Sequence, residues 1–340
     1  MRTAKQLLIT VAVLLCSTVA SAHDFEVGGI YYEILSESDL TVKVNVNYSN
    51  SNEVVIPATV IYNSKTYSVT TIGGYAFSGC TGLTSVTIPN SVTTIGSGAS
   101  CGCIGLTSII VEKGNAVYDS RENCNAIIET QTNTLIAGCK NTIIPGSVTT
   151  IGEYAFEDCD GLTSVTIPNS VTTIERGAFS GCSSLTSITI PNSVTTIEYG
   201  AFSGCNGLTS VTIPNSVTTI GNYAFSYCDG LTSVTIGNSV TTIGERTFRD
   251  CTNLKEIYSL SETPPVVFSI NTFSDYSATL YVPIGAKETY QTTDYWKEFA
   301  NIVEMDFTGI TEISPDATDG FGNGVIYDLY GRPVNEPAKG

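Results

Sequence analysis

The segment IGEYAFEDCDGLTSVTIPNSVTT, residues 151–173, recurs along the chain at a fixed period and decides the fold. The segment is one full repeat, because its first isoleucine, Ile151, has its next equivalent at Ile174. Such self-similarity is the signature of a protein built from stacked repeats. The step from Ile95 to Ile151 is 56 residues, 33 more than one repeat, which predicts an extended coil with a hairpin-like excursion at about residues 107–150. Units of the pattern begin at Ile72, Ile95, Ile151, Ile174, Ile197, Ile220 and Ile243.

The spacing of the apolar residues changes within one unit. From Ile72 to Cys80 they have the spacing of one helical face, which predicts a short helical turn. Gly82 is expected to end this turn in a left-handed conformation. Val86–Ile88 alternates between core and solvent and predicts a short strand, which the following proline ends. The positions equivalent to Gly82 are Gly105, Gly161, Gly207, Gly230 and Asn253.

A single repeat unit is too short to bury its own apolar side chains, so each coil must stack on the next. The expected fold is a repeat solenoid with a short parallel β-strand and a short helical turn in each coil. The solenoid is predicted to cover residues 72–260. An open end of such a stack exposes apolar side chains, so we expect a β-rich N-terminal cap over residues 23–71 and an α/β C-terminal cap over residues 261–307.

Two columns of residues are expected to stack inside the solenoid. The first is Phe77, Phe156, Phe179, Phe202, Phe225 and Phe248, and the second is Cys80, Cys103, Cys159, Cys182, Cys205, Cys228 and Cys251. Free cysteine packs as a small hydrophobe, which favours a column of thiols. Stacking at about 4.8 Å would also bring neighbouring cysteines within disulfide range, although seven is an odd number. Cys101 with Cys103, or Cys124 with Cys139, are alternative pairs, and two thiolates without a histidine do not complete a metal site.

The strand of each unit presents small hydroxyl residues away from the core. They predict two parallel rows on one uncharged face, which can bind a protein or a glycan through many weak hydrogen bonds. The alternative is structural, because threonine is a favourable residue in any exposed strand. The ten residues are Ser85, Thr87, Ser164, Thr166, Ser187, Thr189, Ser210, Thr212, Ser233 and Thr235. Variable positions beside the turn, whose tyrosines could stack on sugars or anchor a partner, are Tyr154, Arg176, Tyr199, Tyr223 and Arg246.

The composition argues against several classes of function. The 340 residues carry 15 Lys+Arg and 32 Asp+Glu, a net charge of −17, which repels phosphate backbones and anionic lipids, so no nucleic-acid partner is expected. The single histidine, His23, argues against histidine catalysis and histidine metal ligands. Acidic residues are dispersed along the coil edges, so neither an enzyme nor a cofactor site is predicted. These acids are Asp158, Asp160, Glu175 and Glu198.

The N-terminus has the pattern of an export signal. Residues 1–22 have a basic start, an apolar run over residues 7–15 and small residues at 20–22, which predicts a secretory signal peptide. A lipoprotein signal at Cys16 is the alternative, although Leu15 stands where such signals have a small residue. The apolar run is shorter than the roughly 20 residues that span a bilayer. We therefore expect an exported monomer without a transmembrane segment.

The repeats resemble the BspA-like leucine-rich repeat surface proteins of Gram-negative anaerobic bacteria. The resemblance is carried by Leu-Thr-Ser-Val-Thr-Ile-Pro followed by Ile-Gly-x-x-Ala-Phe-x-x-Cys over residues 72–257. Residues 24–32 and 263–302 resemble the two caps of that family. Residues 308–340 are predicted to be a linker and an incomplete sorting-domain-like tail, because residues 324–334 resemble the opening of such a domain. A plain acidic tail is the alternative.

The resemblance implies adhesion to host proteins, extracellular matrix or other cells. We therefore expect a secreted or cell-surface protein that binds a protein or glycan ligand outside the cell. The alternatives are a glycan-binding module for polysaccharide capture and a structural spacer of the envelope. A glycan binder favours aromatic rings aligned on one face, whereas the one tryptophan, Trp296, lies in the closing cap.

Overall fold

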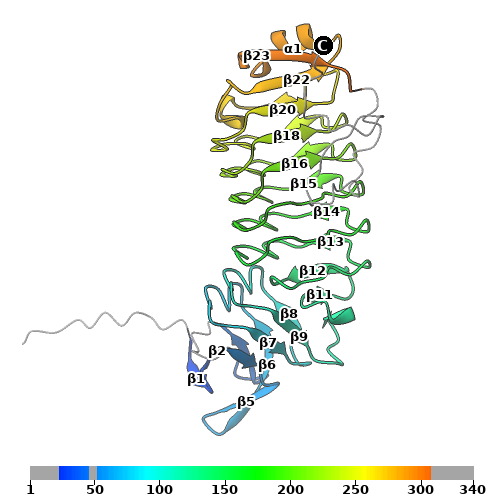
Figure 1. The fold of residues 1–340 in the computed structure, drawn as a ribbon. Coiled ribbons are helices and arrows are strands. Elements are labelled where there is room, and N and C mark those ends of the chain that lie inside the picture. The colour runs from blue at the N-terminus through cyan, green and yellow to red at the C-terminus, as the bar shows by residue number, and fades with distance from the viewer. Residues whose placement is uncertain (1–22, 46–51, 308–340) are drawn as a thin grey trace, which may run out of the picture.

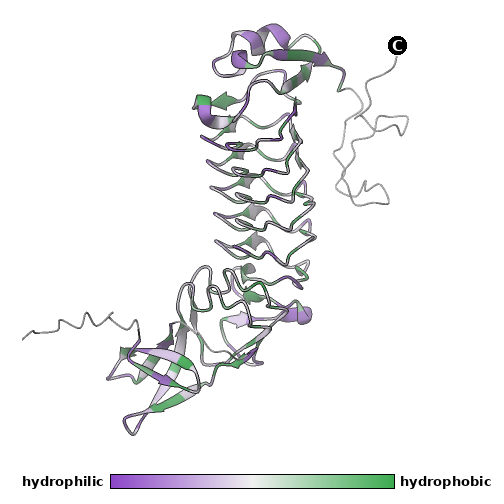
Figure 2. Ribbon diagram, turned by 60° about the vertical axis from the view of Figure 1, so that its left-hand side comes forward, coloured by the Kyte–Doolittle hydropathy of each residue, from purple (hydrophilic) through white to green (hydrophobic). Residues whose placement is uncertain are grey.

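The chain is a solenoid with a cap at each end (Figure 1). The computed structural model describes residues 23–45 and 52–307, so the predicted signal peptide at 1–22 and the predicted tail at 308–340 lie outside the described residues. Polar and apolar segments recur at the same places in successive coils (Figure 2), as the fixed period of the sequence requires. The predicted repeat solenoid is confirmed.

One side of the solenoid is the strand face, formed by the Ser-Val-Thr-Ile segments and their equivalents. Its strands pair in parallel with an offset of one repeat, as in Ser210 with Ser233 and Thr212 with Thr235. Residues 164–167 and 187–190 continue the face through a single bridge between Thr166 and Thr189. The strands are β4 (Glu53–Val55), β7 (Ser85–Ile88), β9 (Ser108–Val111), β16 (Ser210–Ile213), β18 (Ser233–Ile236), β20 (Glu256–Ser259), β22 (Thr279–Pro283) and β23 (Asn301–Met305).

Each coil has a second, shorter strand that the sequence analysis did not predict. It is the Thr-Ile pair that follows Ser-Val-Thr, and successive pairs form one parallel ladder from Thr150 to Val267. The isoleucine of each pair points inward and the threonine outward, as strand alternation requires. The strands are β8 (Thr94–Ile95), β13 (Thr150–Ile151), β14 (Thr173–Ile174), β15 (Thr196–Ile197), β17 (Thr219–Ile220), β19 (Thr242–Ile243) and β21 (Val266–Val267).

The third side of each coil is a chain of tight turns, and the predicted helical turn is wrong in this detail. In the first coil Ser78 N–H donates to Tyr75 O at 3.0 Å and Cys80 N–H donates to Phe77 O at 3.0 Å. Tyr75 has φ 57° and Gly79 has φ 71°, both in the left-handed region of backbone conformation. Two such residues only four positions apart prevent a continuous right-handed helix. Phe77 N–H instead donates to Ala99 O of the next coil at 3.0 Å. The turns are therefore held together between coils.

The predicted left-handed glycines are also corrected, because Gly82 and its equivalents do not have positive φ values. The left-handed positions are those of Gly79 and Tyr75 in each coil. At the predicted position glycine is needed for close approach, since a Cβ on Gly230 would stand 2.2 Å from Asn206 O of the preceding coil. Asn253 has a side chain there, and its Nδ2 donates to Asp229 O at 2.7 Å.

The core contains a continuous column of stacked phenylalanine rings. From Phe156 to Phe273 successive ring centroids lie 5.0 to 5.6 Å apart and the rings are within 9° of parallel. The column runs one residue beyond the prediction, because Phe273 of the C-terminal cap continues it. It does not reach Phe77, which packs in a separate N-terminal core cluster. Gly138 takes the next place beside Phe156, where a Cβ would stand 2.2 Å from the ring.

The excursion in the extended coil is an antiparallel hairpin that rejoins the solenoid. β10 (Tyr118–Asp119) pairs with β11 (Ile127–Glu129), β11 pairs with β12 (Thr134–Ala137), and β12 then pairs in parallel with β13. Arg121, in the 3-10 helix η1 (Arg121–Asn123), stabilises the excursion. Its guanidinium lies 2.7 Å from Asp119 and donates to Asn133 Oδ1 at 2.8 Å.

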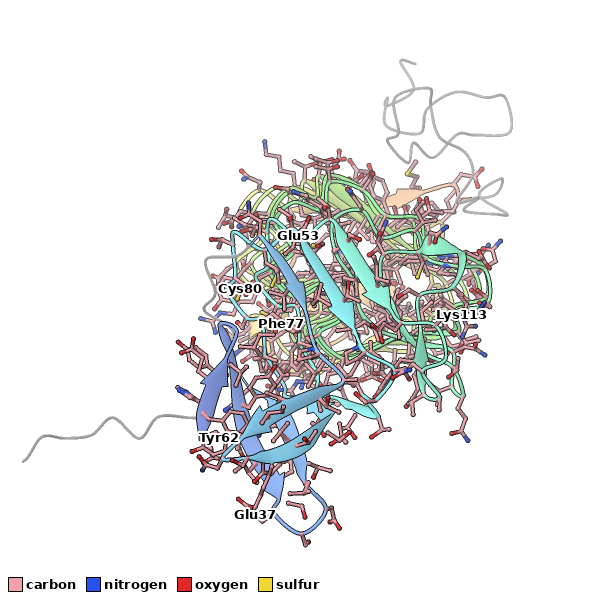
Figure 3. All side chains as sticks on the ribbon, turned by 90° about the horizontal axis from the view of Figure 1, so that it is seen from below. Glu37, Glu53, Tyr62, Phe77, Cys80 and Lys113 are labelled. Carbon is pink, nitrogen blue, oxygen red and sulfur yellow. The ribbon has the colours of Figure 1, made fainter. Side chains whose placement is uncertain are left out.

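The N-terminal cap is a sheet in the order β1-β2-β3-β6-β5, and β6 also pairs with β8 of the solenoid. Figure 3 views the molecule from this end, with Phe77 and Cys80 in the first coil and Glu37 and Tyr62 on the part of the cap that projects to one side. Phe25 stacks on Tyr62 with centroids 4.1 Å apart. The strands are β1 (Phe25–Val27), β2 (Ile30–Ser36), β3 (Thr41–Val44), β5 (Thr59–Tyr62) and β6 (Lys65–Ile72).

The C-terminal cap closes the opposite end with aromatic side chains. Helix α1 (Lys287–Thr292) lies between β22 and β23, with the 3-10 helices η2 (Ile270–Thr272) and η3 (Trp296–Glu298) nearby in the chain. Trp296 is fully buried, and its indole N–H donates to Pro265 O at 2.7 Å. Its ring meets Tyr290 edge to face at 5.3 Å. Within the described ranges, no helix has the length and apolar character needed to cross a membrane.

The close approach of coils at Gly230 can be tested by adding a single methyl group. Gly230→Ala is expected to lower the free energy of unfolding by about 1–3 kcal/mol, because the Cβ meets backbone that cannot rotate away. Gly82→Ala is the matched control, since its nearest neighbour is Asn52 Oδ1 at 4.0 Å. Urea unfolding followed by circular dichroism measures both variants. Equal stability of the two variants would show that the contact at Gly230 is unimportant.

Candidate functional site

The strand face carries the ten predicted hydroxyl residues, and most of them are accessible. Nine are exposed or half-buried: Ser85, Thr87, Ser164, Thr166, Ser187, Thr189, Ser210, Thr212 and Ser233. Thr235 is only 5% exposed, so the prediction that it faces solvent is wrong. Its cross-strand partner is Tyr258, where the neighbouring regular coils have a smaller threonine.

At the N-terminal end of the strand face, the outward row contains aliphatic residues that the sequence analysis missed. Val55 pairs with Thr87, and Thr87 pairs with Ile110. Ile143 holds the same repeat position, two residues before a proline, as Thr166 does. Val55, Ile110 and Ile143 are 65%, 49% and 72% exposed. The face is therefore apolar as well as hydroxyl-bearing. Aligning the units by their prolines could have found Val55 and Ile143, and the step of one repeat from Thr87 could have found Ile110.

At its C-terminal end the same row becomes aromatic. Tyr258 and Tyr281 stack with ring centroids 4.6 Å apart and an angle of 8°. The Tyr258 hydroxyl donates to Glu256 Oε2 at 3.1 Å, and burial raises the pKa of Tyr258. The rings stack on each other along the solenoid axis.

The variable positions beside the turns form a second continuous surface, which we call the edge row. It consists of Tyr75, Tyr154, Arg176, Tyr199, Tyr223 and Arg246, of which Tyr75 was not predicted. The Tyr75 and Tyr154 rings lie 6.2 Å apart, and the Tyr199 and Tyr223 rings lie 5.3 Å apart. The Arg176 guanidinium lies 5.9 Å from the Tyr154 centroid and 4.8 Å from that of Tyr199, and Arg246 lies 5.5 Å from that of Tyr223.

Four members of the edge row have an unfavourable backbone conformation. Tyr75, Tyr154, Tyr223 and Arg246 have φ between 56° and 59°. The same position in other coils is glycine, at Gly98, Gly177 and Gly200, also with positive φ. A left-handed conformation costs a residue with a Cβ about 1–2 kcal/mol. Glycine at this position is therefore sufficient for the fold. Four coils nevertheless have tyrosine or arginine there, despite the cost of the left-handed conformation.

Carboxylates flank the edge row. Burial raises the pKa of Glu175, and the neighbouring carboxylates of Glu153 and Glu198 raise it further. Burial also raises the pKa of Glu157, against the opposing effect of hydrogen bonds from Cys101 and Tyr75. Glu175 is thus repelled by both Glu153 and Glu198 along one edge of the solenoid.

Of the four acids considered in the sequence, two accept hydrogen bonds from other coils and two flank the edge row. Asp160 accepts a hydrogen bond from Ser183 Oγ at 2.6 Å, and Asp158 accepts one from Cys101 Sγ at 3.5 Å. Glu175 and Glu198 are among the carboxylates that flank the edge row. Among residues 23–45 and 52–307, no three His, Cys, Asp or Glu side chains are placed to hold a metal ion.

The cysteines of the predicted column are thiols that bond to the backbone. The Cys205 thiol donates to Phe179 O at 3.1 Å, and Cys103, Cys182, Cys228 and Cys251 make the same contact with the phenylalanine 26 residues earlier, at 2.9 to 3.2 Å. Cys159 is buried and Cys80 is half-buried.

The pairs left open as disulfides are also separate thiols. Cys124 donates to Ala126 O at 3.7 Å, and Cys139 donates to Asn125 O at 3.3 Å. Cys101 donates to Asp158, and Cys103 to Phe77 O.

Comparison with known proteins identifies the repeats. The profile described as the BspA type leucine rich repeat region matches residues 48–136 and 128–255 in six copies. No curated protein matches the chain.

Solved structures share the architecture at low sequence identity. The pneumococcal vaccine antigen PcpA is 17% identical with a TM-score of 0.52, and the match covers 83% of this chain and 97% of that one. A leucine-rich repeat protein from Bacteroides ovatus is 25% identical with a TM-score of 0.49, covering 83% of this chain and 77% of that one. A leucine rich cell surface protein from Faecalibacterium prausnitzii is 22% identical with a TM-score of 0.45, covering 70% and 95%. The likeness to PcpA supports the solenoid fold.

The buried thiols predict a loss of stability at alkaline pH. Burial raises the pKa of Cys205 from 9.0 to about 12, so the folded state keeps a proton that the unfolded chain releases above pH 9. The free energy of unfolding that the protonated Cys205 thiol contributes is complete below about pH 9 and is lost as the pH rises towards 12. Cys205→Ser removes the titrating group while keeping a donor. It is expected to reduce the fall in unfolding free energy between about pH 9 and 10.5 by about 2 kcal/mol.

Denaturant titrations at the two pH values measure this difference. Cys80→Ser is the control, because that thiol is only half-buried and the pH dependence is expected to change less. An identical pH dependence in wild type and Cys205→Ser would contradict the assignment of a buried, protonated thiol.

Proposed function

Because the chain belongs to the BspA-type leucine-rich repeat family, we propose that it is an exported, cell-surface protein that adheres to other proteins through its strand face. The family is consistent with protein binding and adhesion in general. The proposed target is a host protein, an extracellular-matrix protein or a protein of another cell. The ten hydroxyl positions of the sequence analysis, without Thr235, are proposed to contribute.

The observation that carries this proposal is the exposed aliphatic part of the strand face. Val55, Ile110 and Ile143 are 49% to 72% exposed at outward positions of the strand face, where most of the regular coils have serine or threonine. An exposed apolar area on a strongly acidic protein marks an interaction surface. Short side chains on a regular sheet also leave the face flat, so a partner can contact many coils at once and gain avidity from the repetition.

The aromatic residues favour a protein over a glycan as the partner. A sugar ring stacks on an exposed aromatic face. Trp296 is fully buried, and Tyr258 and Tyr281 stack on each other. The strand face therefore offers hydroxyl and aliphatic groups more than ring faces, which suits a polypeptide surface.

The proposed location follows from two supports. The pattern of residues 1–22 predicts export, and one structural neighbour is named as a leucine rich cell surface protein. Residues 324–334 are proposed to belong to an anchoring or sorting segment.

A charge placed on the strand face is expected to abolish protein binding. Thr189→Lys with Thr212→Lys adds two long cationic side chains to adjacent coils. The affinity for a protein ligand is expected to fall at least about tenfold, because the lysines must be desolvated in the interface. Residues 23–340 are tested against a panel of extracellular-matrix proteins and glycans by biolayer interferometry, with circular dichroism to verify folding.

The matched control places the same two charges on another side of the same coils. Thr195 and Thr218 are exposed and precede the second strand, so Thr195→Lys with Thr218→Lys should leave binding unchanged. An equal loss of protein binding in both double-lysine variants would show that the added net charge, and not the strand face, is responsible for the loss. A glycan ligand would favour polysaccharide capture, and no ligand in either panel would favour an envelope spacer.

A further inference from the structure

The edge row is a second surface, formed by the turns and not by the strand face. We propose that the edge row and its flanking carboxylates bind an arginine-containing segment of another polypeptide. This inference is independent of the strand-face proposal, because the two surfaces use different residues of each coil.

The first support is the retention of large side chains where glycine suffices. Tyr75, Tyr154 and Tyr223 have left-handed backbones, whereas Gly98 and Gly200 fill the same position elsewhere. A strained backbone conformation that is kept although the fold does not require it indicates a functional role for the residue. Tyr75 is 43% exposed, and Tyr199, which does not have this strain, is also 43% exposed, so part of the aromatic surface of the edge row is available to a partner.

The second support is that the edge row already holds guanidinium groups of its own chain. Arg176 lies between the Tyr154 and Tyr199 rings, within the range of a cation–π contact with both. Arg246 lies over Tyr223 and donates to its hydroxyl. The spacing of the rings along the solenoid therefore admits a planar cation between coils. An arginine from outside can occupy the same kind of place beside Tyr75.

The third support is the charge around the edge row. Glu153, Glu175 and Glu198 come from three successive coils, and Glu175 feels the charge of both others. Arg176 Nε lies 3.9 Å from Glu153 Oε1, which relieves only part of this repulsion. The whole chain has a net charge of −17. A basic ligand is thus favoured by the flanking carboxylates and by the overall field.

The same geometry disfavours a sugar as the ligand. The Tyr75 ring lies against Gly98 and the Tyr154 ring against Gly177, where an added Cβ would stand 2.7 Å and 2.4 Å from ring carbons. These rings therefore have one face on the next coil. A guanidinium is thin enough to enter beside such rings, as Arg176 does, and arginine stacks on aromatic faces better than lysine.

The test uses a fluorescent deca-arginine peptide, a deca-lysine peptide and residues 23–340 of the protein, with binding followed by anisotropy. Tyr75→Gly with Tyr154→Gly copies the glycines of the neighbouring coils, so it removes the ring beside which the outside arginine is placed, removes the adjacent ring, and relaxes the backbone. Its thermal stability should not fall. Deca-arginine affinity is expected to fall about tenfold or more, and wild type should prefer deca-arginine over deca-lysine.

A charge control separates this site from general attraction to an acidic protein. Glu153→Gln with Glu198→Gln removes two charges beside the edge row, and Glu288→Gln with Glu298→Gln removes two exposed charges on the C-terminal cap. The first pair should weaken deca-arginine binding more than the second. Thr189→Lys with Thr212→Lys tests independence and should affect this binding no more than Thr195→Lys with Thr218→Lys.

The proposal is overturned if the two tyrosine substitutions leave deca-arginine affinity unchanged, or if both glutamate pairs weaken it equally. It is also overturned if a neutral oligosaccharide binds and the tyrosine variant loses that binding, because the edge row would then be a glycan site. Loss of protein binding in the strand-face variant has no bearing on these outcomes.

Discussion

The stacking of one coil on the next, at an offset of one repeat, is the constraint on which the rest of the structure depends. Backbone hydrogen bonds run between coils on the strand face, along the Thr-Ile strands and between the turns. Within one coil the backbone makes only tight turns, so an isolated coil would leave most of its amides and its apolar side chains unsatisfied. Stability therefore comes from the contact between each coil and its neighbours. The first and last coils each lack one neighbour, so the two ends of the solenoid require caps.

The same constraint explains the composition of the core. Beside the buried aliphatic side chains of each regular coil, the narrow interior with its fixed rise accommodates one flat ring and one small side chain, which phenylalanine and cysteine supply. The thiol has a further role, because it donates a second hydrogen bond to a phenylalanine carbonyl of the preceding coil, which already accepts a turn bond from the cysteine N–H of its own coil. Cysteine thus combines the size of a small hydrophobe with a weak donor.

Stacking also turns single positions into surfaces. A position that varies little from coil to coil forms a row of like residues along the solenoid. The strand face is therefore uniform along its middle and changes towards its ends, where the repeats are irregular, at Val55, Ile110 and Ile143 and at Tyr258 and Tyr281. The edge row arises at positions that differ between coils, where tyrosine and arginine alternate with glycine. A flat, largely uncharged face and a charged aromatic edge can therefore serve different partners on one scaffold.

The sequence by itself determined the solenoid, the extended coil and the inward phenylalanine and cysteine positions, because the period and the apolar spacing fix which residues must be buried. Only the tertiary structure decided how the turns are built, since the left-handed Tyr75 and Gly79 are stabilised by bonds to the next coil. It also decided that Thr235, which pairs with Tyr258, is buried and that Arg176 lies near two tyrosine rings. These features depend on contacts between residues about one repeat apart or more, which local sequence patterns do not contain.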